Sequence, residues 1–500
     1  MYEQEFLMTS DILQKARDYE ERFGAFIGES ERPVFHYSTR IGWLNDPNGF
    51  SVYNGRYHLF HQYHPYSNQW GPMHWGHAAS ADMLHWEYLP ASLAPDTEYD
   101  GAGCFSGSAV TLDDGRQLLL YTGVREEQQP DGSKKAYQTQ CVAVGDGVNY
   151  EKYAFNPVLS GRDVPEGFSE NDFRDPKIFR ERDGSFGCVV GCRTDDESGA
   201  ILYFRSEDGF RWDFVSVVDR SWNEYGKMWE CPDLFELDGK AVLLTSPQDM
   251  SPIGLEFHNG NETLCVIGSM DEKNELQRES VQAIDYGIDF YAPQTLLTPD
   301  GRRVMIAWMQ NWDTCTSHPS DAKWFGQMTL PRELIIRGGR LCQNPIRELD
   351  AMRGRRVSYE NIPVSAETTL RGVYGRVLDM TVTVRPRSNG SYDLFRLKFA
   401  KGSQHYSSVS YRPAEQLLHL SRKMSGFNRD FVHDRRIIVA DRAGEIKLRI
   451  ILDRFSAEIF VNDGEQTLTM TYYTPLSADG ISFEAHGDAV IDVEKYDVRA

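Results

Sequence analysis

The sequence predicts an all-β protein, a five-bladed β-propeller followed by a C-terminal β-sandwich, with a short helix at the N-terminus. Three observations predict it: hairpin turns that repeat about every 60 residues, strand-like segments in the last third of the chain, and a change of composition between the two parts. We expect an N-terminal helical extension over 1–35, the propeller over 36–340, a linker over 341–355 and the sandwich over 356–500.

The N-terminal segment has the pattern of one amphipathic helix. Apolar residues recur at a spacing of three to four between Ile12 and Phe23, which places them on one helix face. Thr9, Ser10 and Asp11 precede this pattern and are residue types that cap helices. We therefore expect a short helix over 10–23.

Hairpin turns repeat through the first two thirds of the chain. Asx-Gly dipeptides, the strongest short signal of a β-hairpin, occur at Asn54-Gly55, Asp114-Gly115, Asp183-Gly184, Asp238-Gly239 and Asp300-Gly301. A second marker, an Asp that closes a strand, recurs with a similar period at Asp82, Asp146, Asp208 and Asp271. A unit of about 60 residues suits one four-stranded blade, and five units close a ring. Unrelated hairpins in a sandwich or a barrel are the alternative, because such dipeptides are common in β proteins.

The last third of the chain has the pattern of a β-sandwich. Strand-like segments lie at 376–384, 392–400, 406–411, 437–440, 447–452, 457–461 and 467–473, with turns between them. All ten tryptophans and all eight cysteines lie at or before residue 342, so the composition changes near the predicted boundary. Seven or more short strands suggest a sandwich, and we expect its role to be structural support.

The composition excludes several classes of partner. The chain has 53 Lys and Arg against 74 Asp and Glu, a net charge of −21, which disfavours nucleic acid and anionic membrane. No apolar run approaches the roughly 20 residues of a spanning helix. The N-terminus lacks a signal segment, and the scattered cysteines form no disulfide pattern. We expect a cytoplasmic protein with reduced thiols; a homo-oligomer stays open, because a sandwich edge could pair with a second chain.

Acidic residues recur at one level of the predicted propeller. The first strand of each blade lines the central channel, so residues at equal distances from the turns converge there. Counting back eight residues from each turn gives Asp46, Ser106, Asp175 and Glu230, and nine back from the last turn gives Tyr291. Counted from the prolines, Glu230 is one residue out of register, and a one-residue slip flips a strand side chain. The position of Glu230 therefore depends on which marker is used.

Three carboxylates in one channel would repel one another, so they either hold a cation or perform carboxylate chemistry. Their sequence neighbours include Trp43, Phe173 and Trp229, and an apolar, aromatic setting favours sugar stacking over an ion. Glycoside hydrolysis uses two carboxylates, one as nucleophile and one as acid and then base. The alternative for any one acid is a turn or the start of a strand.

A stretch rich in histidine and aromatic residues lies in the predicted first blade. His58, His61 and His64 suggest a metal site, but on a strand His61 points opposite to the other two. We therefore expect no metal and prefer a polar, stacking wall in which Gln62 forms hydrogen bonds and Trp70 or Trp75 stacks on a sugar. A packed aromatic core with satisfied histidines is the alternative. The sequence contains no nucleotide-binding loop, HExxH or GxSxG motif, and we expect no cofactor.

Four blocks resemble the signature motifs of glycoside hydrolase family 32, the β-fructosidases. They are Trp43-Leu44-Asn45-Asp46-Pro47-Asn48-Gly49, Phe105-Ser106-Gly107-Ser108, Phe173-Arg174-Asp175-Pro176-Lys177 and Trp229-Glu230-Cys231-Pro232-Asp233, in the family's order. A late block at 453–464 resembles the family's C-terminal module, so the resemblance spans nearly the whole chain from about residue 36. It implies a five-bladed propeller followed by a β-sandwich.

The resemblance also implies a function, that of a retaining β-fructofuranosidase acting on sucrose, sucrose-6-phosphate or short fructo-oligosaccharides. By the family pattern Asp46 would be the nucleophile, Glu230 the acid and then the base, and Asp175 would hold fructosyl hydroxyls and steady the transition state. The positions that match the family's contacts to the fructosyl unit are Asn45, Gln62, Trp70, Phe105, Ser106, Arg174, Tyr291 and Trp308.

The residues beside two of the acids predict their charge state. Asn45 and Asn48 could donate hydrogen bonds that keep Asp46 ionised, and Arg174 should favour the carboxylate form of Asp175.

Two other functions stay open. An exo-inulinase, a levanase or a fructosyltransferase of the same family would differ in its products from sucrose, inulin and levan. A non-catalytic sugar-binding propeller would release no reducing sugar, and the presence of all three acids disfavours it. The segment 71–77 and the missing signal segment look like the intracellular bacterial sucrose or sucrose-6-phosphate hydrolases. His64 departs from the asparagine of many members, which puts the outer wall of the subsite in doubt.

Overall fold

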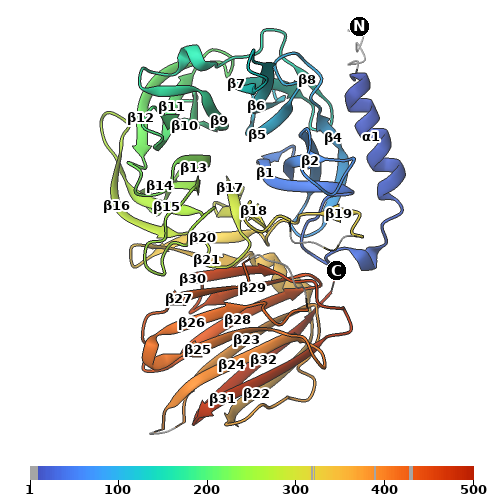
Figure 1. The fold of residues 1–500 in the computed structure, drawn as a ribbon, viewed down its shortest axis with the longest axis vertical. Helices are drawn as coiled ribbons and strands as arrows, with labels where there is room; N and C mark the ends of the chain where they lie inside the picture. Colours follow the sequence, from blue (N-terminus) through green and yellow to red (C-terminus); the bar gives the residue numbers. More distant parts are fainter. Residues whose placement is uncertain (1–8, 317–318, 320, 388–389, 427–431, 500) are drawn as a thin grey trace.

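The computed structural model describes residues 9–316, 319, 321–387, 390–426 and 432–499. Five sheets of four or five strands surround a common axis, and two further sheets, of six and five strands, lie face to face beside them (Figure 1). The predicted class, a β-propeller followed by a β-sandwich with one N-terminal helix, is confirmed. Within the described ranges, no helix is long and apolar enough to span a membrane.

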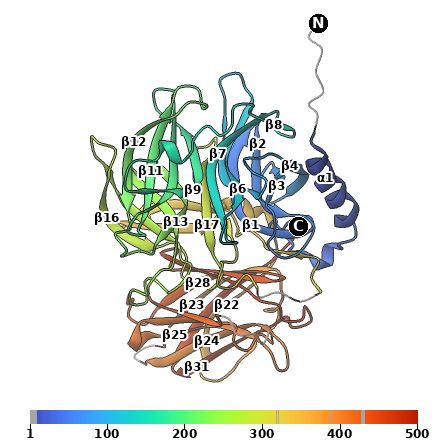
Figure 2. The same cartoon turned by 45° about the horizontal axis from the view of Figure 1, so that its top comes forward.

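The predicted N-terminal helix is α1 (Asp11–Gly24). The hydroxyl of Ser10 caps it by accepting a hydrogen bond from the amide of Leu13 at 3.1 Å. Its buried Glu20 accepts the amide of Ala91 at 2.8 Å. The helix therefore covers the outer strand of the first sheet, at the side of the propeller (Figure 2), and η1 (Glu29–Glu31) follows it.

Each propeller sheet begins at the axis and runs outward. The first contains β1 (Gly42–Tyr53), β2 (Arg56–His64), β3 (His74–Ser80) and β4 (Trp86–Leu93), and β19 (Trp324–Phe325) pairs parallel to β1. The second contains β5 (Gly103–Thr111), β6 (Gln117–Gln128), β7 (Lys134–Gly145) and β8 (Tyr150–Lys152). After η2 (Gly161–Asp163), the third contains β9 (Phe168–Arg180), β10 (Phe186–Thr194), β11 (Gly199–Ser206) and β12 (Asp213–Arg220). The fourth contains β13 (Met228–Leu237), β14 (Lys240–Gln248), β15 (Leu264–Met270) and β16 (Leu276–Ala283), and the fifth β17 (Tyr291–Leu297), β18 (Arg303–Trp308), β20 (Arg332–Arg337) and β21 (Arg340–Pro345).

Both sequence markers lie at equivalent turns. Each of the five Asx-Gly pairs joins the first strand of a sheet to the second. Their glycines have φ between +75° and +91°, which glycine adopts without steric cost. The second marker lies between the third and fourth strands of the first four sheets, where the carboxylate accepts backbone amides; Asp82, for example, accepts those of Leu84 and His85.

The sandwich is built from two antiparallel sheets. One contains β22 (Arg353–Val364), β32 (Ala489–Val498), β23 (Leu378–Pro386), β28 (Ile446–Asp453), β29 (Ser456–Val461) and β30 (Gln466–Thr471), in that order. The other contains β27 (Asp434–Ile438), β26 (Leu417–Ser421), β25 (Ser407–Arg412), β24 (Tyr392–Lys401) and β31 (Gly480–Gly487), with η4 (Pro413–Glu415) before β26. All seven predicted strands are present, and β22, β26, β31 and β32 are additional to them.

The predicted linker, 341–355, is regular structure rather than a free connection. It includes most of β21, which pairs with β20 in the propeller, then η3 (Arg347–Met352), then the start of β22. The last propeller strand therefore ends at Pro345.

Buried charged side chains join the propeller to the sandwich. Arg332 of β20 contacts Asp285 at 2.9 Å through Nη1 and Glu458 of β29 at 2.8 Å through Nε. His36 contacts Asp453 at 2.9 Å and Glu458 at 2.8 Å with its two ring nitrogens. All five side chains are fully buried. We call His36, Arg332, Asp453 and Glu458 the interface cluster; its two carboxylates lie in the late block that resembles the family's C-terminal module.

Candidate active site

The first strands of the five sheets bring the predicted acids together near the axis. Asp46 lies on β1, Ser106 on β5, Asp175 on β9, Glu230 on β13 and Tyr291 on β17, the five strands that surround the axis in Figure 1. We call Asp46, Asp175 and Glu230 the acid cluster.

A β-bulge interrupts each of these five strands at its site residue. The pairing with the second strand shifts within 44–47, 105–107, 174–177, 230–233 and 291–294. In three strands the residue before the proline has a positive φ: 67° at Asp175, 49° at Cys231 and 52° at Ala292. Bulges re-aim side chains and are frequent beside active sites, and positive φ is costly for these residue types. The X-Pro pairs of the sequence therefore mark the bulges.

The bulge of β13 brings two consecutive residues, Glu230 and Cys231, to the site. The proline marker makes Cys231, not Glu230, the equivalent of Asp175, and Cys231 also contacts the acids. Its thiol lies 3.5 Å from Asp46 Oδ2 and 3.6 Å from Asp175 Oδ2. Both consecutive residues of β13 therefore take part in the site, and the one-residue offset in the sequence is real.

Asp46 is buried, and only one of its two carboxylate oxygens has a hydrogen-bond partner among the described residues. Its Oδ2 accepts a hydrogen bond from Ser106 Oγ at 2.7 Å, whereas its Oδ1 has no hydrogen-bond partner in the part of the chain that the structure describes. Burial and the charge of Glu230 raise the pKa of Asp46 to about 6, against the effect of hydrogen bonds from Ser106, Asn45 and Cys231. Asp46 is ionised above that pH and has one oxygen free to react.

Asp175 is held by the backbone of the neighbouring sheet. Its Oδ2 accepts the amide of Cys231 at 3.0 Å. Burial and the charge of Glu230 raise its pKa to about 7, although Arg174 lowers it. Arg174 does favour the carboxylate form of Asp175, as expected, but burial and the charge of Glu230 have the larger effect on its pKa. The arginine is next to Asp175 in sequence but forms its ion pair with Glu230.

Glu230 is the most fully hydrogen-bonded member of the acid cluster. Its Oε1 accepts from Arg174 Nε at 2.9 Å and ion-pairs with Arg174 Nη2 at 2.8 Å. Its Oε2 accepts from Tyr291 OH at 2.7 Å and from Gln248 Nε2 at 2.9 Å. These donors come from three sheets, so the carboxyl group is held in one orientation.

The remaining predicted contacts lie at different depths. Asn45 is buried and accepts Trp43 Nε1 at 2.7 Å. Gln62 of β2 is buried and donates to the carbonyl of Cys104 at 3.0 Å. Trp70 is 49% exposed, and its ring lies edge-on to the half-buried ring of Phe105, with 6.2 Å between centroids.

Trp308 is placed behind the site. It lies on β18 opposite Tyr291, is fully buried, and contacts Trp43 edge-on with 6.0 Å between ring centroids. The tryptophan therefore supports Trp43.

Two residues of the site carried no recognised signal in the sequence. Gln248 lies on a second strand, where no marker was available, and Cys231 stood out only as a neighbour of Glu230. Burial raises the pKa of the Cys231 thiol well above its usual range, so the group stays protonated beside the two acids.

Two of the three histidines of β2, His58 and His61, belong to the core, whereas His64 is half-buried. His58 Nδ1 contacts His77 Nε2 at 2.9 Å, and His61 contacts Tyr37 OH at 3.0 Å. Burial lowers the pKa of both His58 and His61 to about 4. Among the residues with described positions, no group of three or more His, Cys, Asp or Glu is arranged to hold a metal ion.

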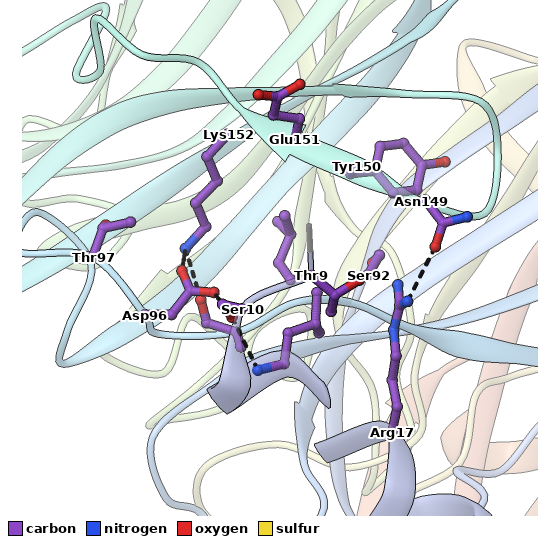
Figure 3. Close-up of a pocket in the computed structure, with 13 residues that line it drawn as sticks. Thr9, Ser10, Arg17, Ser92, Asp96, Thr97, Asn149, Tyr150, Glu151 and Lys152 are labelled. Carbon is purple, nitrogen blue, oxygen red and sulfur yellow. Dashed lines mark hydrogen bonds and ion pairs between the residues drawn. The ribbon is translucent and has the colours of Figure 1, made fainter. Parts of the chain in front are cut away.

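A large cavity lies apart from the acid cluster. It has a volume of about 620 Å³ and lies between α1 and the first two sheets (Figure 3). Lys152 pairs there with Asp96, and Arg17 donates to Asn149 at 3.0 Å. Neither the acid cluster nor any residue predicted to contact the fructosyl unit lines it, so the cavity is separate from the site.

Comparisons with known proteins agree with this arrangement. The model of the glycosyl hydrolases family 32 N-terminal domain matches residues 36–345, and that of the family 32 C-terminal domain matches residues 348–500. Raffinose invertase of Escherichia coli is 37% identical over 482 residues, which cover 96% of this chain and 97% of that protein. Sucrose-6-phosphate hydrolase of Escherichia coli is 34% identical over 494 residues, 97% of this chain and 98% of that protein.

A solved structure gives the same result for the fold. A mutant of a Bombyx mori family 32 β-fructofuranosidase, in complex with sucrose, superimposes with a TM-score of 0.83 at 33% identity. The match covers 98% of this chain and 99% of that one.

Proposed function

The chain belongs to glycosyl hydrolase family 32, and from that premise we propose that its acid cluster cleaves terminal β-fructofuranosyl bonds with retention of configuration. The protein is a glycoside hydrolase of the β-fructofuranosidase type. Sucrose, sucrose-6-phosphate and short fructo-oligosaccharides are the substrates we propose, in keeping with the names of the relatives. One observation carries the proposal: the three acids of three separate sheets meet around one thiol and one arginine.

In the first step Asp46 attacks. Its Oδ1 forms a bond to the anomeric carbon of the fructosyl unit while the bond from that carbon to the leaving oxygen breaks. The ionised state above about pH 6 and the unpartnered oxygen support this role. The hydrogen bond from Ser106 fixes the other oxygen.

Glu230 gives its proton to the leaving oxygen in this step and takes a proton from water in the second, when water attacks the fructosyl-Asp46 ester. Because the acids interact, the proton is a property of the cluster rather than of one residue. Burial and the charge of Glu230 raise the pKa of Asp175 to about 7, so the cluster binds a proton more readily than separate carboxylates would.

Asp175 accepts hydrogen bonds from fructosyl hydroxyls, and Asn45, Gln62, Phe105, Ser106, Arg174 and Tyr291 complete the contacts to this unit or orient the acids. Trp308 acts through Trp43. These assignments rest on positions near the acids and on the family resemblance.

Two variants test the division of roles. In Glu230→Gln the first step should be much slower with sucrose but close to its normal rate with 4-nitrophenyl β-fructofuranoside, measured as the burst of released nitrophenol, because that leaving group needs no proton. Asp46→Asn should lose activity on both substrates, because both need the nucleophile. Equal losses of the first-step rate on the two substrates in Glu230→Gln would contradict the acid role.

The same acids would serve an exo-inulinase, a levanase or a fructosyltransferase, so product analysis on sucrose, inulin and levan separates these activities. A protein that releases no reducing sugar from any of them would be the sugar-binding alternative.

We also propose a cytoplasmic location. All eight cysteines are free, and seven of them are buried, as is usual in a reducing compartment. Fractionation of cells that express the protein tests this. A homo-oligomer stays a prediction.

A further inference from the structure

The hairpin of β6 and β7 extends past the end of the channel at which the acids lie. β5 begins at Gly103, which pairs with Val124 of β6. Beyond that point residues 125–128 continue to pair with 134–137. Ser106, which contacts Asp46, lies close to the same end of β5. The hairpin therefore forms a wall on the outer side of the acid cluster.

The base of this hairpin reaches the partner of Glu230. Gln138 Oε1 accepts from the amide of Phe173 at 3.0 Å and from Arg174 Nη1 at 3.3 Å. Arg174 in turn ion-pairs with Glu230. The wall therefore lies beside Glu230, the residue that would protonate the leaving oxygen. A leaving sugar has to lie next to that residue.

A cavity of about 470 Å³ lies between the hairpin and Trp70, a size typical of small-molecule sites. Its lining includes Trp70, Glu98, Gly101, Arg125, Glu126 and Lys134. The indole of Trp70 is 49% exposed and offers a flat apolar face of the kind on which sugars stack. The lining has two basic side chains, Arg125 and Lys134, and two acidic ones, Glu98 and Glu126, so its formal charges cancel.

Both basic side chains of the cavity already have carboxylate partners. Lys134 Nζ contacts Glu126 Oε2 at 2.6 Å. Arg125 Nη1 lies 3.6 Å from Glu127 Oε2, and its guanidinium covers the ring of Tyr137 at 4.4 Å. A phosphate group would compete with these carboxylates for the same donors and would lie close to their negative charge. Neutral hydroxyl groups can share the donors and acceptors without that penalty.

We propose that this cavity is the subsite for the leaving sugar, that it takes an uncharged hexosyl group stacked on Trp70, and that the Lys134–Glu126 ion pair selects against a phosphorylated leaving group. The proposal rests on the proposed function and adds the substrate class of its leaving side. Sucrose and raffinose have uncharged leaving sugars, whereas that of sucrose-6-phosphate carries a phosphate.

The test compares kcat/KM for sucrose and sucrose-6-phosphate in the full-length protein. Sucrose should be preferred by about tenfold or more, since like charges that face each other suppress the wrong partner. Glu126→Gln releases Lys134, so the ratio of kcat/KM for sucrose-6-phosphate to that for sucrose should rise several-fold. Glu279→Gln is the matched control, because it breaks an exposed Lys240–Glu279 pair of 2.7 Å on the fourth sheet and should leave the ratio unchanged.

Equal or better use of sucrose-6-phosphate by the unmodified protein would overturn the proposal, as would an unchanged ratio in Glu126→Gln or the same rise in Glu279→Gln. Those results leave the proposed function intact, because fructose is still released. Release of fructose from neither sugar would instead reject the proposed function.

Discussion

Two groups of buried carboxylates in this molecule have opposite electrostatic behaviour. In the acid cluster, burial raises the pKa of Asp46 to about 6 and that of Asp175 to about 7. In the interface cluster, Asp453 and Glu458 are just as buried, yet their pKa values are lowered. Burial alone therefore does not decide the charge state.

The difference lies in the partners. Burial opposes ionisation of Asp453, but the carboxylate contacts His36 and accepts the amides of Val34 and Phe35 at 2.8 Å and 3.1 Å. Asp46 has Ser106 and a thiol, and one of its oxygens has no partner among the described residues. Asp453, with several donors, stabilises the fold, whereas Asp46, with few donors, keeps an oxygen available for chemistry.

The same substitution in the two clusters should have opposite consequences. Asp46→Asn removes the nucleophile and should lower kcat on sucrose by about 10⁴-fold, about 5.5 kcal/mol of activation free energy. It also relieves repulsion with Glu230, so the thermal midpoint should not fall. Steady-state kinetics and thermal unfolding check this, and near-normal turnover would reject the role of Asp46.

Asp453→Asn should cost stability instead. It leaves His36 without its carboxylate in a fully buried position, and breaking a buried pair costs about 3–5 kcal/mol. Urea unfolding measures the loss. In the folded fraction kcat should equal that of the unmodified protein, and a large loss of kcat at unchanged stability would reverse our assignment of the two clusters.

The pH dependence of the unfolding free energy should show how much the protonated His36 stabilises the fold. Burial opposes its charge, but hydrogen bonds with Asp453 and Glu458 raise its pKa to about 9. The protonated ring therefore stabilises the fold fully below the pKa of an unfolded histidine, about 6.5, and this contribution of roughly 3 kcal/mol is lost as the pH rises to 9. The carboxylates have lowered pKa values, so their contribution is present above about pH 4.5 and is lost as the pH falls through the lowered values.

Unfolding free energies between pH 6 and 10 measure the histidine contribution. In His36→Gln the alkaline loss should be reduced. The exposed His85→Gln is the control, and an equal change in both variants would argue against the interface cluster.

The smallest expected effect concerns the hydrogen bond on Asp46. Ser106 lowers the pKa of Asp46, so Ser106→Ala should raise it and move the acidic limb of the kcat/KM profile to higher pH by up to about one unit, about 1.4 kcal/mol. Ser108→Ala is matched on the same strand, but its hydroxyl donates to the carbonyl of Pro176. A shift in the Ser108 variant and none in the Ser106 variant would contradict the geometry of the acid cluster.

Local sequence patterns predicted most of the fold and the strands on which the acids lie. The Asx-Gly turns could be found because each glycine has a positive φ that few other residues adopt, and one marker per sheet placed Asp46, Ser106 and Asp175 on equivalent strands. Glu230 stood out of register because the turn after β13 has two residues, 238–239, whereas the turn after β9 has five, 181–185, so the counts from the turns and from the prolines differ by one.

Long-range pairs could not be predicted in the same way. His36 meets Asp453 across 417 residues, and Arg332 meets Glu458 across 126. No spacing in the sequence encodes such contacts, because they depend on how sheets and domains pack. The interface cluster was therefore visible only as part of a block that resembled the family.

Trapping the covalent intermediate is the most direct test of the central claim that Asp46, which has one oxygen without a partner among the described residues, is the nucleophile. Glu230→Gln, mixed with 4-nitrophenyl β-fructofuranoside and quenched with acid, should accumulate a fructosyl ester, because removal of the base slows the attack of water. Peptide mass spectrometry should find the added hexosyl mass on Asp46. A label on Asp175 or another residue, or no label together with inverted product, would contradict the account.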